Sequence, residues 1–400
     1  MNMNQSFKGV DFYGIEELLS PEERRQRDKM RAWVSERFLP AASQHFQAGG
    51  FPLEWIPQLA KLNAFGATIK GYGCASLSSI AYGLIMQELE RGDSGLRTFA
   101  SVQGALAMNA IASFGTEEQK NRWLGAMARG EKIGCFGLTE PEAGSNPAQM
   151  TCTAAKTSNG YVLNGTKMWI GNATFCDLAI VWAKVQENDG SSSGKRQIRG
   201  FLVEKGFPGF RTELIQGKMS LRVSPTGKLI FENCHMPETA VLPGTSGLKS
   251  ALQCLNHARY GIVWGTIGSA MACYEEARLY AAKRVQFGKP IASFQLTQRK
   301  LALMLTELTK AQLLALRLGQ LKDAGKVTPA QISMAKRNNV EAAIEIARLA
   351  RDVLGGVGIL DQYQCFRHLC NLESVKTYEG TDDMHLLILG QDITGVGAFS

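Results

Sequence analysis

The stretch Leu248–Lys283, LKSALQCLNHARYGIVWGTIGSAMACYEEARLYAAK, predicts a single long helix. Small residues lie along one of its faces, which suits close packing against another helix; they are Gly261, Gly265, Gly268 and Ala270. Three further helical stretches follow, at Leu296–Ala324, Pro329–Leu354 and Asp382–Ile393. The first of these spans roughly 43 Å at the usual helical rise. Helices of this length with short connections predict a four-helix bundle over residues 247–400.

The pattern that precedes the bundle has a period of two, which is typical of strands. The strand-like runs between residues 133 and 246 are Cys135–Leu138, Thr151–Ala155, Tyr161–Ile170, Asp177–Lys184, Gly200–Glu204 and Lys228–Phe231. Ser158-Asn159-Gly160 separates two of them, and Asn164-Gly165 marks either a tight turn or a bulge. Gln186–Arg196 is rich in glycine and serine and predicts an exposed hairpin tip. We expect a compact all-β middle domain, either a barrel or a sandwich.

Residues 1–132 have the pattern of a helical domain. Ser20-Pro21-Glu22-Glu23 predicts a helix that starts with a capping box and runs to about Phe38, where Pro40 stops it. Further helices are predicted at Leu53–Asn63, Leu77–Arg91 and Val102–Phe114, and after the capping box Thr116-Glu117-Glu118-Gln119. Gly92-Asp93-Ser94-Gly95 interrupts the pattern, so we expect Leu96-Arg97-Thr98 to follow a flexible turn that aims a side chain at a ligand. The fold class is therefore multidomain α+β.

Composition and charge argue against several classes of protein. The 400 residues are 45% hydrophobic and 20% charged, with no apolar run that could span a membrane and no signal-peptide core. We expect a cytoplasmic protein, or one of the mitochondrial matrix in a eukaryote. The nine cysteines and five histidines lack Cys-x-x-Cys or metal-ligand spacing, so neither a disulfide framework nor a metal site is expected. The net charge of +8 is spread along the chain, which favours anionic small molecules over nucleic acid.

Glu379 is the candidate general base. It stands between an aromatic ring and a glycine in Thr377-Tyr378-Glu379-Gly380-Thr381, just before Thr381 and Asp382, which can cap the final helix. Tyr378 would shield the carboxylate from water and raise its pKa, and Gly380 would allow a ligand to approach closely. On spacing alone, a solvated Glu at a helix start is the simpler interpretation. Motifs elsewhere in the chain favour the base.

These motifs, taken in order, resemble those of the acyl-CoA dehydrogenases. They are Phe136-Gly137-Leu138-Thr139-Glu140-Pro141, Gly144-Ser145, Gly165-Thr166-Lys167-Met168-Trp169-Ile170, Arg284-Val285-Gln286-Phe287-Gly288 and Tyr378-Glu379-Gly380-Thr381. The resemblance covers nearly the whole chain and implies the fold of that family, with domains at 1–132, 133–246 and 247–400. Within the family the chain is most similar to glutaryl-CoA dehydrogenase, on the segments Thr68–Cys74, Glu88–Arg91, Asp93–Gly95, Ala258–Ile262 and Asn371–Glu373.

The resemblance implies an enzyme that dehydrogenates an acyl-CoA with FAD as its cofactor. Glu379 would take the α-proton, and Ala258 stands where some relatives carry an alternative base. Arg97, with Thr98 and Glu90, would hold the distal carboxylate of glutaryl-CoA, whose oxidation and loss of CO2 give crotonyl-CoA, a step of amino-acid catabolism. The other substrate-binding residues implied are Ser145, Leu252, Asn256, Arg259, Tyr378 and Gly380.

The FAD-binding residues that the resemblance implies form two groups. Those at the flavin ring are Phe136, Leu138, Thr139, Gly144, Ser145, Trp169, Ile170 and Gly171. Those at the diphosphate and adenine, across a subunit interface, are Arg284, Gln286, Phe287, Gln295, Asp352, Leu354, Gly355 and Gly356, and Thr381, Asp383 and Phe399 complete the set. Trp169 would pack on the flavin ring; without the motif it would be interpreted as a core aromatic. The implied partners are an electron-transfer flavoprotein and further copies of the chain in a homotetramer.

Alternatives to the glutaryl enzyme remain open. The chain departs from the likeness at Leu96, Thr98, Asn146, Gly171, Val357 and Asp382. These departures leave room for a dehydrogenase of another short-chain acyl-CoA. A DNA-binding flavoprotein on the same scaffold is a further alternative, but it would carry a basic block near its C-terminus, which Gly390–Ser400 lacks.

Overall fold

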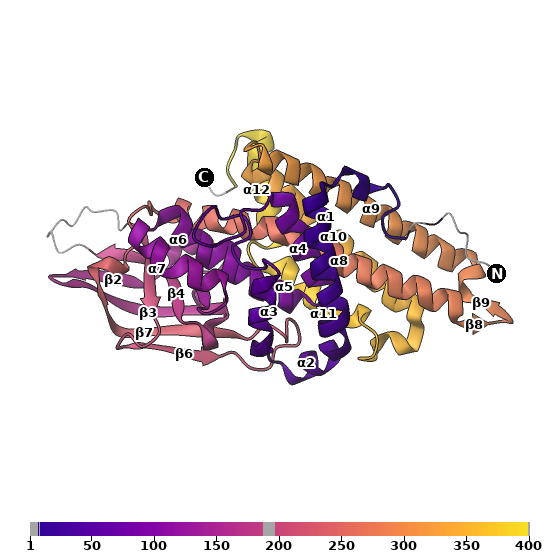
Figure 1. Ribbon diagram of the computed structural model, residues 1–400, viewed down its shortest axis with the longest axis horizontal. Coiled ribbons are helices and arrows are strands. Elements are labelled where there is room, and N and C mark those ends of the chain that lie inside the picture. The colour runs from indigo at the N-terminus through magenta and orange to yellow at the C-terminus, as the bar shows by residue number, and fades with distance from the viewer. Residues whose placement is uncertain (1–6, 8, 187–196, 399–400) are drawn as a thin grey trace.

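The computed structural model describes residues 7, 9–186 and 197–398, and it places the predicted sheet and the helical bundle at opposite ends of an elongated molecule (Figure 1). Helices from the first third of the chain lie between and beside them. None of the helices in these ranges is long and apolar enough to cross a membrane. The expected hairpin tip at Gln186–Arg196 lies, apart from its first residue, outside the described residues.

The N-terminal helices are α1 (Pro21–Trp33), α2 (Ala42–Ala48), α3 (Ile56–Lys61), α4 (Ser79–Gly92), α5 (Ser94–Ser101), α6 (Asn109–Phe114) and α7 (Glu117–Ala128). Both predicted capping boxes are confirmed: Ser20 exchanges hydrogen bonds with Glu23, and Thr116 with Gln119. The first helical run continues from α1 through a π-helical segment, Val34–Phe38, and so reaches Phe38 as predicted, but Pro40 does not stop the chain from turning further. Pro40 instead lies in the short 3-10 turn Leu39–Ala41 that leads into α2, because proline fits the first turn of a helix.

The flexible turn predicted before Arg97 was also wrong. Asp93 is the N-cap of α5, and its carboxylate Oδ1 accepts a hydrogen bond from the backbone N–H of Gly95 at 2.7 Å. The break in the pattern is therefore a helix cap between α4 and α5. Arg97 consequently lies on a helix, with its side chain fully buried.

The middle of the chain forms one seven-stranded mixed sheet in the order β1-β4-β2-β3-β7-β6, with β5 paired to β4. Its strands are β1 (Gly134–Gly137), β2 (Thr153–Thr157), β3 (Gly160–Gly171), β4 (Leu178–Gln186), β5 (Ile198–Glu204), β6 (Phe210–Leu214) and β7 (Thr226–Pro237). Strand β6 was missed in the sequence. Asn164-Gly165 is a bulge within β3, where the register with β7 shifts and Gly165 takes a φ of 134°.

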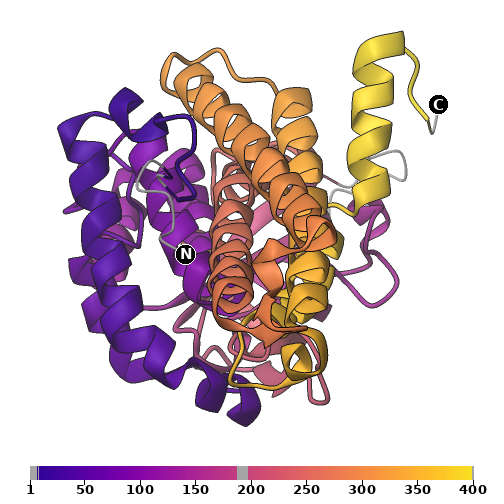
Figure 2. The same cartoon turned by 90° about the vertical axis from the view of Figure 1, so that its right-hand side faces the viewer.

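The bundle consists of α8 (Leu248–Lys283), α9 (Gln295–Asp323), α10 (Pro329–Leu354) and α11 (Cys365–Thr377), and a short hairpin of β8 (Val285–Gln286) and β9 (Lys289–Pro290) follows α8. The predicted fourth helix is α12 (Asp382–Thr394), which projects beside the bundle (Figure 2). Helix α11 was missed because its cap is remote in sequence: the carboxylate of Glu276 on α8 accepts hydrogen bonds from the backbone of Gln364 and Cys365 at 3.0–3.1 Å.

The glycine face of α8 packs directly on α4, which is the close helix contact that its small residues predicted. A Cβ atom on Gly265 would overlap Glu90 Oε2, and one on Gly268 would overlap the backbone of Gln87. Only glycine therefore allows the two helices to approach this closely. The consequence for the site is that Glu90 and Arg97, at the C-terminal end of α4 and on α5, are enclosed by the middle of α8.

Candidate active site

The loop between α11 and α12 carries Tyr378, Glu379 and Gly380. Glu379 has a φ of 55°, a left-handed conformation that is uncommon for a residue with a side chain. Gly380 follows with a φ of 101°, and a Cβ atom there would press on His385 Nε2 at 3.0 Å. Thr381 is the N-cap of α12, as predicted, and accepts a hydrogen bond from the Met384 N–H at 3.3 Å. The loop therefore holds Glu379 in a conformation that needs support from its surroundings.

That support comes from two buried cations of the bundle. Arg259, on α8, donates from Nε to the carbonyl oxygen of Glu379 at 2.7 Å. Lys336, on α10, donates from Nζ to the carbonyl oxygens of Tyr378 at 3.2 Å and Gly380 at 2.8 Å. Arg259 was predicted as a substrate-binding residue, and the structure shows it bound to the base loop. Lys336 was missed, because nothing in its local sequence indicates that its amine reaches this loop.

The predicted carboxylate-binding residues form one cluster next to Glu379, in which Glu90 and Arg97 are buried and Thr98 is half-buried. Arg97 is fully buried and donates from Nε to Glu90 Oε2 at 2.6 Å. Its Nη2 donates to the Tyr378 hydroxyl, and its Nη1 has no hydrogen-bond partner among the described residues. Thr98 donates from Oγ1 to the Ser94 carbonyl at 2.7 Å and lies 3.5 Å from the Tyr378 hydroxyl. The structure therefore brings Glu90, Arg97 and Thr98 together as predicted, and it adds the Tyr378 hydroxyl, which was not predicted there.

A second polar cluster fixes α5 against α11. The Asp93 carboxylate accepts from Asn371 Nδ2 at 3.0 Å and forms an ion pair with Arg367 Nε at 3.2 Å. Asn371 in turn accepts at Oδ1 from the backbone N–H of Leu221 at 2.7 Å. Because Arg97 lies on α5 and Tyr378 directly follows α11, this cluster sets the distance between the two groups. Arg367 and Asn371 were not among the predicted site residues.

The Glu379 carboxylate is poised to exchange a proton near neutral pH. Burial raises its pKa to about 7, and the positive charges of Arg97, Arg259 and Lys336 oppose that rise. Its Oε2 accepts no hydrogen bond from any of the described residues. A carboxylate with a free acceptor and a pKa close to the working pH suits a general base. The expectation that this loop raises the pKa of Glu379 is confirmed, with desolvation as its main cause.

The residues predicted at the flavin ring lie along β1 and the end of β3. Phe136, Leu138 and Ile170 are buried, Thr139 and Gly171 are half-buried, and Gly144 and Ser145 are exposed. Trp169 is 57% exposed with a φ of 63°, so the alternative that it is a core aromatic is wrong. The left-handed residue lies in the register shift between Lys167 and Ile170, where β3 interrupts its pairing with β7, and its indole is exposed.

A buried ion pair that was missed in the sequence fixes this segment. Lys167 Nζ lies 2.8 Å from Glu140 Oε1 and donates to the Leu138 carbonyl at 3.1 Å. Glu140 also accepts from the backbone N–H groups of Thr151 and Cys152, at 2.5 and 3.0 Å. Since Lys167 and Trp169 share β3, the pair sets the position of the exposed indole relative to Leu138 and Thr139. Both residues lie inside quoted motifs, but their pairing depends on strands far apart in sequence.

The residues predicted at the diphosphate and adenine lie mostly at the far end of the bundle. Arg284, Gln286, Phe287 and Gln295 are exposed around the β8–β9 hairpin, with Phe287 93% exposed. Asp352 and the exposed Gly355 and Gly356 end α10, where Asp352 pairs with Lys300 of α9, and Leu354 is buried. This end lies opposite the sheet (Figure 1), so one chain does not bring the two predicted groups together. Thr381 and Asp383 begin α12, and Phe399 lies outside the described residues.

Two of the remaining predicted substrate residues, Leu252 and Asn256, lie on α8. Leu252 is 37% exposed, and Asn256 accepts at Oδ1 from Arg259 Nη1 at 3.1 Å. They lie up to two helical turns before Arg259, so a ligand that follows this part of α8 would reach the base loop. Ser145, predicted to serve substrate and cofactor, is exposed on the loop after β1.

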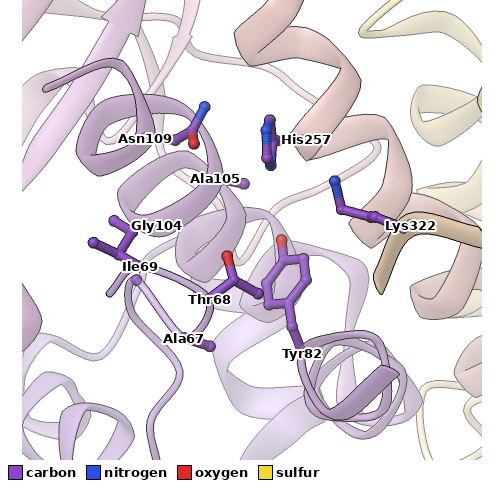
Figure 3. A pocket seen from close by; sticks show the side chains of 10 residues that line it. Ala67, Thr68, Ile69, Tyr82, Gly104, Ala105, Asn109, His257 and Lys322 are labelled. Carbon is purple, nitrogen blue, oxygen red and sulfur yellow. The ribbon is translucent and has the colours of Figure 1, made fainter. Parts of the chain in front are cut away.

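A small polar cavity lies between α4 and α8, lined by Tyr82 of α4 and His257 of α8 (Figure 3). It has room for about one water molecule. Its polar lining comes from Thr68, Tyr82, Asn109, His257 and Lys322, whose polar groups surround a common space. Burial lowers the pKa of His257 to about 4, so its imidazole is neutral at pH 7. None of the predicted catalytic or substrate residues lines this cavity.

Comparison with known proteins gives consistent results over the whole chain. Models of the acyl-CoA dehydrogenase N-terminal, middle and C-terminal domains match residues 20–131, 135–234 and 245–394. The short-chain specific acyl-CoA dehydrogenase, mitochondrial, of Homo sapiens is 34% identical over 362 residues, which cover 90% of this chain and 87% of that protein.

Two solved structures are more similar still. A crystal structure of glutaryl-CoA dehydrogenase from Mycobacterium smegmatis has a TM-score of 0.95 and 50% identity, over 98% of this chain and all of the other. A structure of a glutaryl-CoA dehydrogenase from the same organism in complex with FADH2 has a TM-score of 0.94 and 46% identity, over 98% of this chain and 99% of the other.

Proposed function

The chain belongs to the acyl-CoA dehydrogenase family, and on that basis we propose that it oxidises and decarboxylates glutaryl-CoA to crotonyl-CoA and CO2. As in the rest of the family, its cofactor is FAD. We propose that the electrons pass on to an electron-transfer flavoprotein. The observation that carries the choice of substrate is the buried guanidinium of Arg97 beside the candidate base.

Arg97 is suited to bind a carboxylate that comes from outside the protein. Its charge is buried, Glu90 fixes its orientation, and its Nη1 lacks a partner among the described residues. A buried donor without a partner is unfavourable, and a ligand carboxylate would satisfy it with a charge-assisted hydrogen bond. Arg97 also contacts Tyr378, the neighbour of Glu379, so a ligand held here extends toward the base. A dicarboxylic acyl chain fits this arrangement better than an apolar chain.

The residues of the β1–β3 segment fit a flavin ring. The exposed Trp169 indole offers a flat apolar face, and Thr139 and Ser145, which follow β1, offer hydroxyl groups. Gly171 packs against Val102, because a Cβ atom on Gly171 would come within 3.2 Å of the Val102 side chain. We propose that these residues hold the ring. When bound, FAD supplies the acceptor for the hydride that leaves the substrate's β-carbon.

In the proposed reaction, Glu379 removes the α-proton of the thioester. Its pKa of about 7 means that a large fraction of the carboxylate is ionised at pH 7 and can accept the proton. The Arg97 guanidinium lies over the Tyr378 ring, 5.6 Å from its centroid, and we propose that this ring limits the access of water to the neighbouring Glu379 carboxylate. Arg259 and Lys336 hold the loop carbonyls, so the carboxylate keeps its direction while its charge changes.

Decarboxylation follows from the same arrangement. Oxidation leaves a double bond between the α and β carbons, so the bond from the γ-carbon to the distal carboxylate can break heterolytically. CO2 leaves, and the electron pair is delocalised through the chain to the thioester as a dienolate. Protonated Glu379 then returns its proton to the dienolate, which gives crotonyl-CoA. Arg97 keeps the carboxylate at the site until this step, and Glu379 is ready for another cycle.

Dehydrogenation of another short-chain acyl-CoA is the second candidate. The observation in its favour is that the curated relative reported above is a short-chain enzyme, with 34% identity. Under this alternative Arg97 is a structural partner of Glu90 and Tyr378. The fully buried Arg97–Glu90 pair is compatible with such a role.

We also propose that a second copy of the chain completes the cofactor site. Arg284, Gln286 and Phe287 lie exposed at the β8–β9 hairpin, away from the sheet that carries Trp169 (Figure 1), which supports their contributing to the site of a neighbouring copy. We further propose that the chain assembles as a homotetramer. We also propose that its domains end at residues 132 and 246.

The test is a comparison of kcat/KM for glutaryl-CoA and butyryl-CoA. The two substrates differ only by the distal carboxylate, so their ratio isolates the contribution of that group. We expect glutaryl-CoA to be the better substrate and crotonyl-CoA to be the product of both. Preference for butyryl-CoA would favour the second candidate.

A further inference from the structure

Lys336 is a buried lysine whose amine serves the base loop from a different helix. Its side chain is 1% exposed, in the first third of α10. Its Nζ donates to the carbonyl oxygens of Gly380, Tyr378 and Lys376 at 2.8, 3.2 and 3.4 Å. An ammonium has three N–H groups, so these three acceptors can use all of its donors. In the described residues, no carboxylate forms an ion pair with Lys336.

The three acceptors are arranged on both sides of Glu379. Lys376 belongs to the last turn of α11, where backbone carbonyls lack helical partners. Tyr378 and Gly380 are the two neighbours of Glu379. Arg259 Nε binds the remaining carbonyl of this loop, that of Glu379 itself, at 2.7 Å. The amine and Arg259 together therefore fix the peptide groups before and after a residue that is held at a φ of 55°.

Charged groups from several elements surround the amine. They are Glu379 on the loop, Arg259 on α8, Arg97 on α5, and Asp382 at the start of α12, and the His385 imidazole on α12 is close by. Burial lowers the pKa of Lys336 to about 7, while the carboxylate of Glu379 acts in the opposite direction. Burial lowers the pKa of His385 to about 3, so that ring stays neutral. The ionised forms of Lys336 and Glu379 therefore stabilise each other.

We propose that Lys336 is a positioning residue for the base: it holds the Tyr378–Gly380 loop in its active conformation and favours the ionised form of the Glu379 carboxylate. The inference rests on the proposed role of Glu379. It goes beyond the substrate and cofactor contacts considered so far, because Lys336 acts through the backbone and through its charge.

Three variants separate the charge from the hydrogen bonds. Lys336→Met removes both, Lys336→Gln keeps N–H donors without a charge, and Lys336→Arg keeps both in a larger group. Lys376→Met is the matched control, since Lys376 also links α10 and α11, through an ion pair with Glu341 at 2.7 Å, but its amine does not reach the loop carbonyls. FAD content is checked by the visible spectrum of each purified variant.

The measurement is the pH profile of kcat and kcat/KM with glutaryl-CoA. In Lys336→Gln we expect the acidic limb to move to higher pH by about one unit, which is about a tenfold loss below the pKa, because the nearby positive charge is gone. Lys336→Met should show the same shift and a further loss of kcat, with KM changed much less. Lys336→Arg should recover most of the wild-type profile, and Lys376→Met should match the wild type.

If Lys336→Met does not fold, the Lys336→Gln variant alone tests the inference. A Lys336→Gln enzyme with wild-type kcat and an unshifted acidic limb would overturn the inference. Glu379→Gln distinguishes this from failure of the proposed function. If Glu379→Gln remains active, Glu379 is not the base; if it is inactive while the Lys336 variants behave as wild type, only the role of Lys336 is wrong.

Discussion

Replacing Arg97 with methionine tests the recognition of a substrate carboxylate. The change removes the guanidinium and keeps a long unbranched side chain in the same space. In the wild type this guanidinium is fully buried, with Nε 2.6 Å from Glu90 Oε2. Its free Nη1 is the group that we expect to meet the distal carboxylate of glutaryl-CoA. The variant should therefore lose preference for a dicarboxylic acyl chain.

Replacing Arg97 costs free energy in two ways: it weakens the interaction with the substrate, and it lowers the stability of the fold. A hydrogen bond to a charged partner contributes about 1.5–3 kcal/mol, and a buried charge pair with the substrate brings the total to about 2–4 kcal/mol. This corresponds to a decrease of about 30- to 700-fold in kcat/KM for glutaryl-CoA. Leaving Glu90 buried without its partner costs about 3–5 kcal/mol of folding stability in addition. That second part lowers the melting temperature and acts on every substrate.

The assay removes the stability effect by using a ratio. Kcat/KM is measured for glutaryl-CoA and for butyryl-CoA with each variant, and a general loss of folded enzyme cancels in the quotient. The double variant Arg97→Met with Glu90→Gln restores neutrality in the buried site and should recover stability without recovering selectivity. Arg97→Lys is the control for charge alone, because an ammonium lacks the planar fork of the guanidinium.

We expect the glutaryl-to-butyryl ratio to fall in Arg97→Met and in the double variant, and to fall less in Arg97→Lys. A ratio in Arg97→Met within about threefold of the wild-type ratio would refute the reasoning, since it would leave less than about 1 kcal/mol for the carboxylate. In that case Arg97 has a structural role, and the short-chain candidate becomes the preferred function.

Three further outcomes are expected. Glu379→Gln should lower kcat by about 10²- to 10⁴-fold while the purified protein keeps its FAD spectrum, and a smaller loss would mean that another group is the base. In the wild type, kcat/KM should rise with pH through about 7, because the pKa of Glu379 is raised to about 7 and only the ionised carboxylate accepts the proton. A profile that is flat between pH 6 and pH 8 would contradict the assignment of Glu379 as the base. Gly265→Ala should lower both the melting temperature and the preference for glutaryl-CoA, because the added Cβ overlaps Glu90 Oε2. Gly390→Ala on α12 is the control, since a Cβ atom there meets no other group.

Local signals predicted much of the fold. The long helices α8 and α10 have the predicted limits, because a capping box or a continuous helical pattern marks them in the sequence. Helix α11 was missed because Glu276, which caps it, lies about 90 positions earlier in the chain and meets it only in the folded bundle. A cap supplied from another helix leaves no sequence pattern at the helix start.

The site residues divide in the same way, into those that the sequence motifs predict and those that depend on contacts between distant elements. Glu379, Arg97, Glu90 and Tyr378 were predicted from the motifs, and the structure places them next to one another. The burial of Arg97 was not predicted. In the sequence, Asp93 indicates a turn, and only the structure shows that its carboxylate caps α5. Lys336 and Lys167 were missed for a further reason: a buried lysine is recognised by its partners, and those lie on other elements of the fold.

The most direct test of the proposed activity is an anaerobic titration of the purified FAD-containing protein with glutaryl-CoA, with the acyl-CoA products and CO2 measured at each addition. We predict that the flavin absorbance bleaches and that crotonyl-CoA and CO2 appear in equal amounts. Bleaching with butyryl-CoA but not with glutaryl-CoA, or oxidation of glutaryl-CoA without release of CO2, would contradict the proposal.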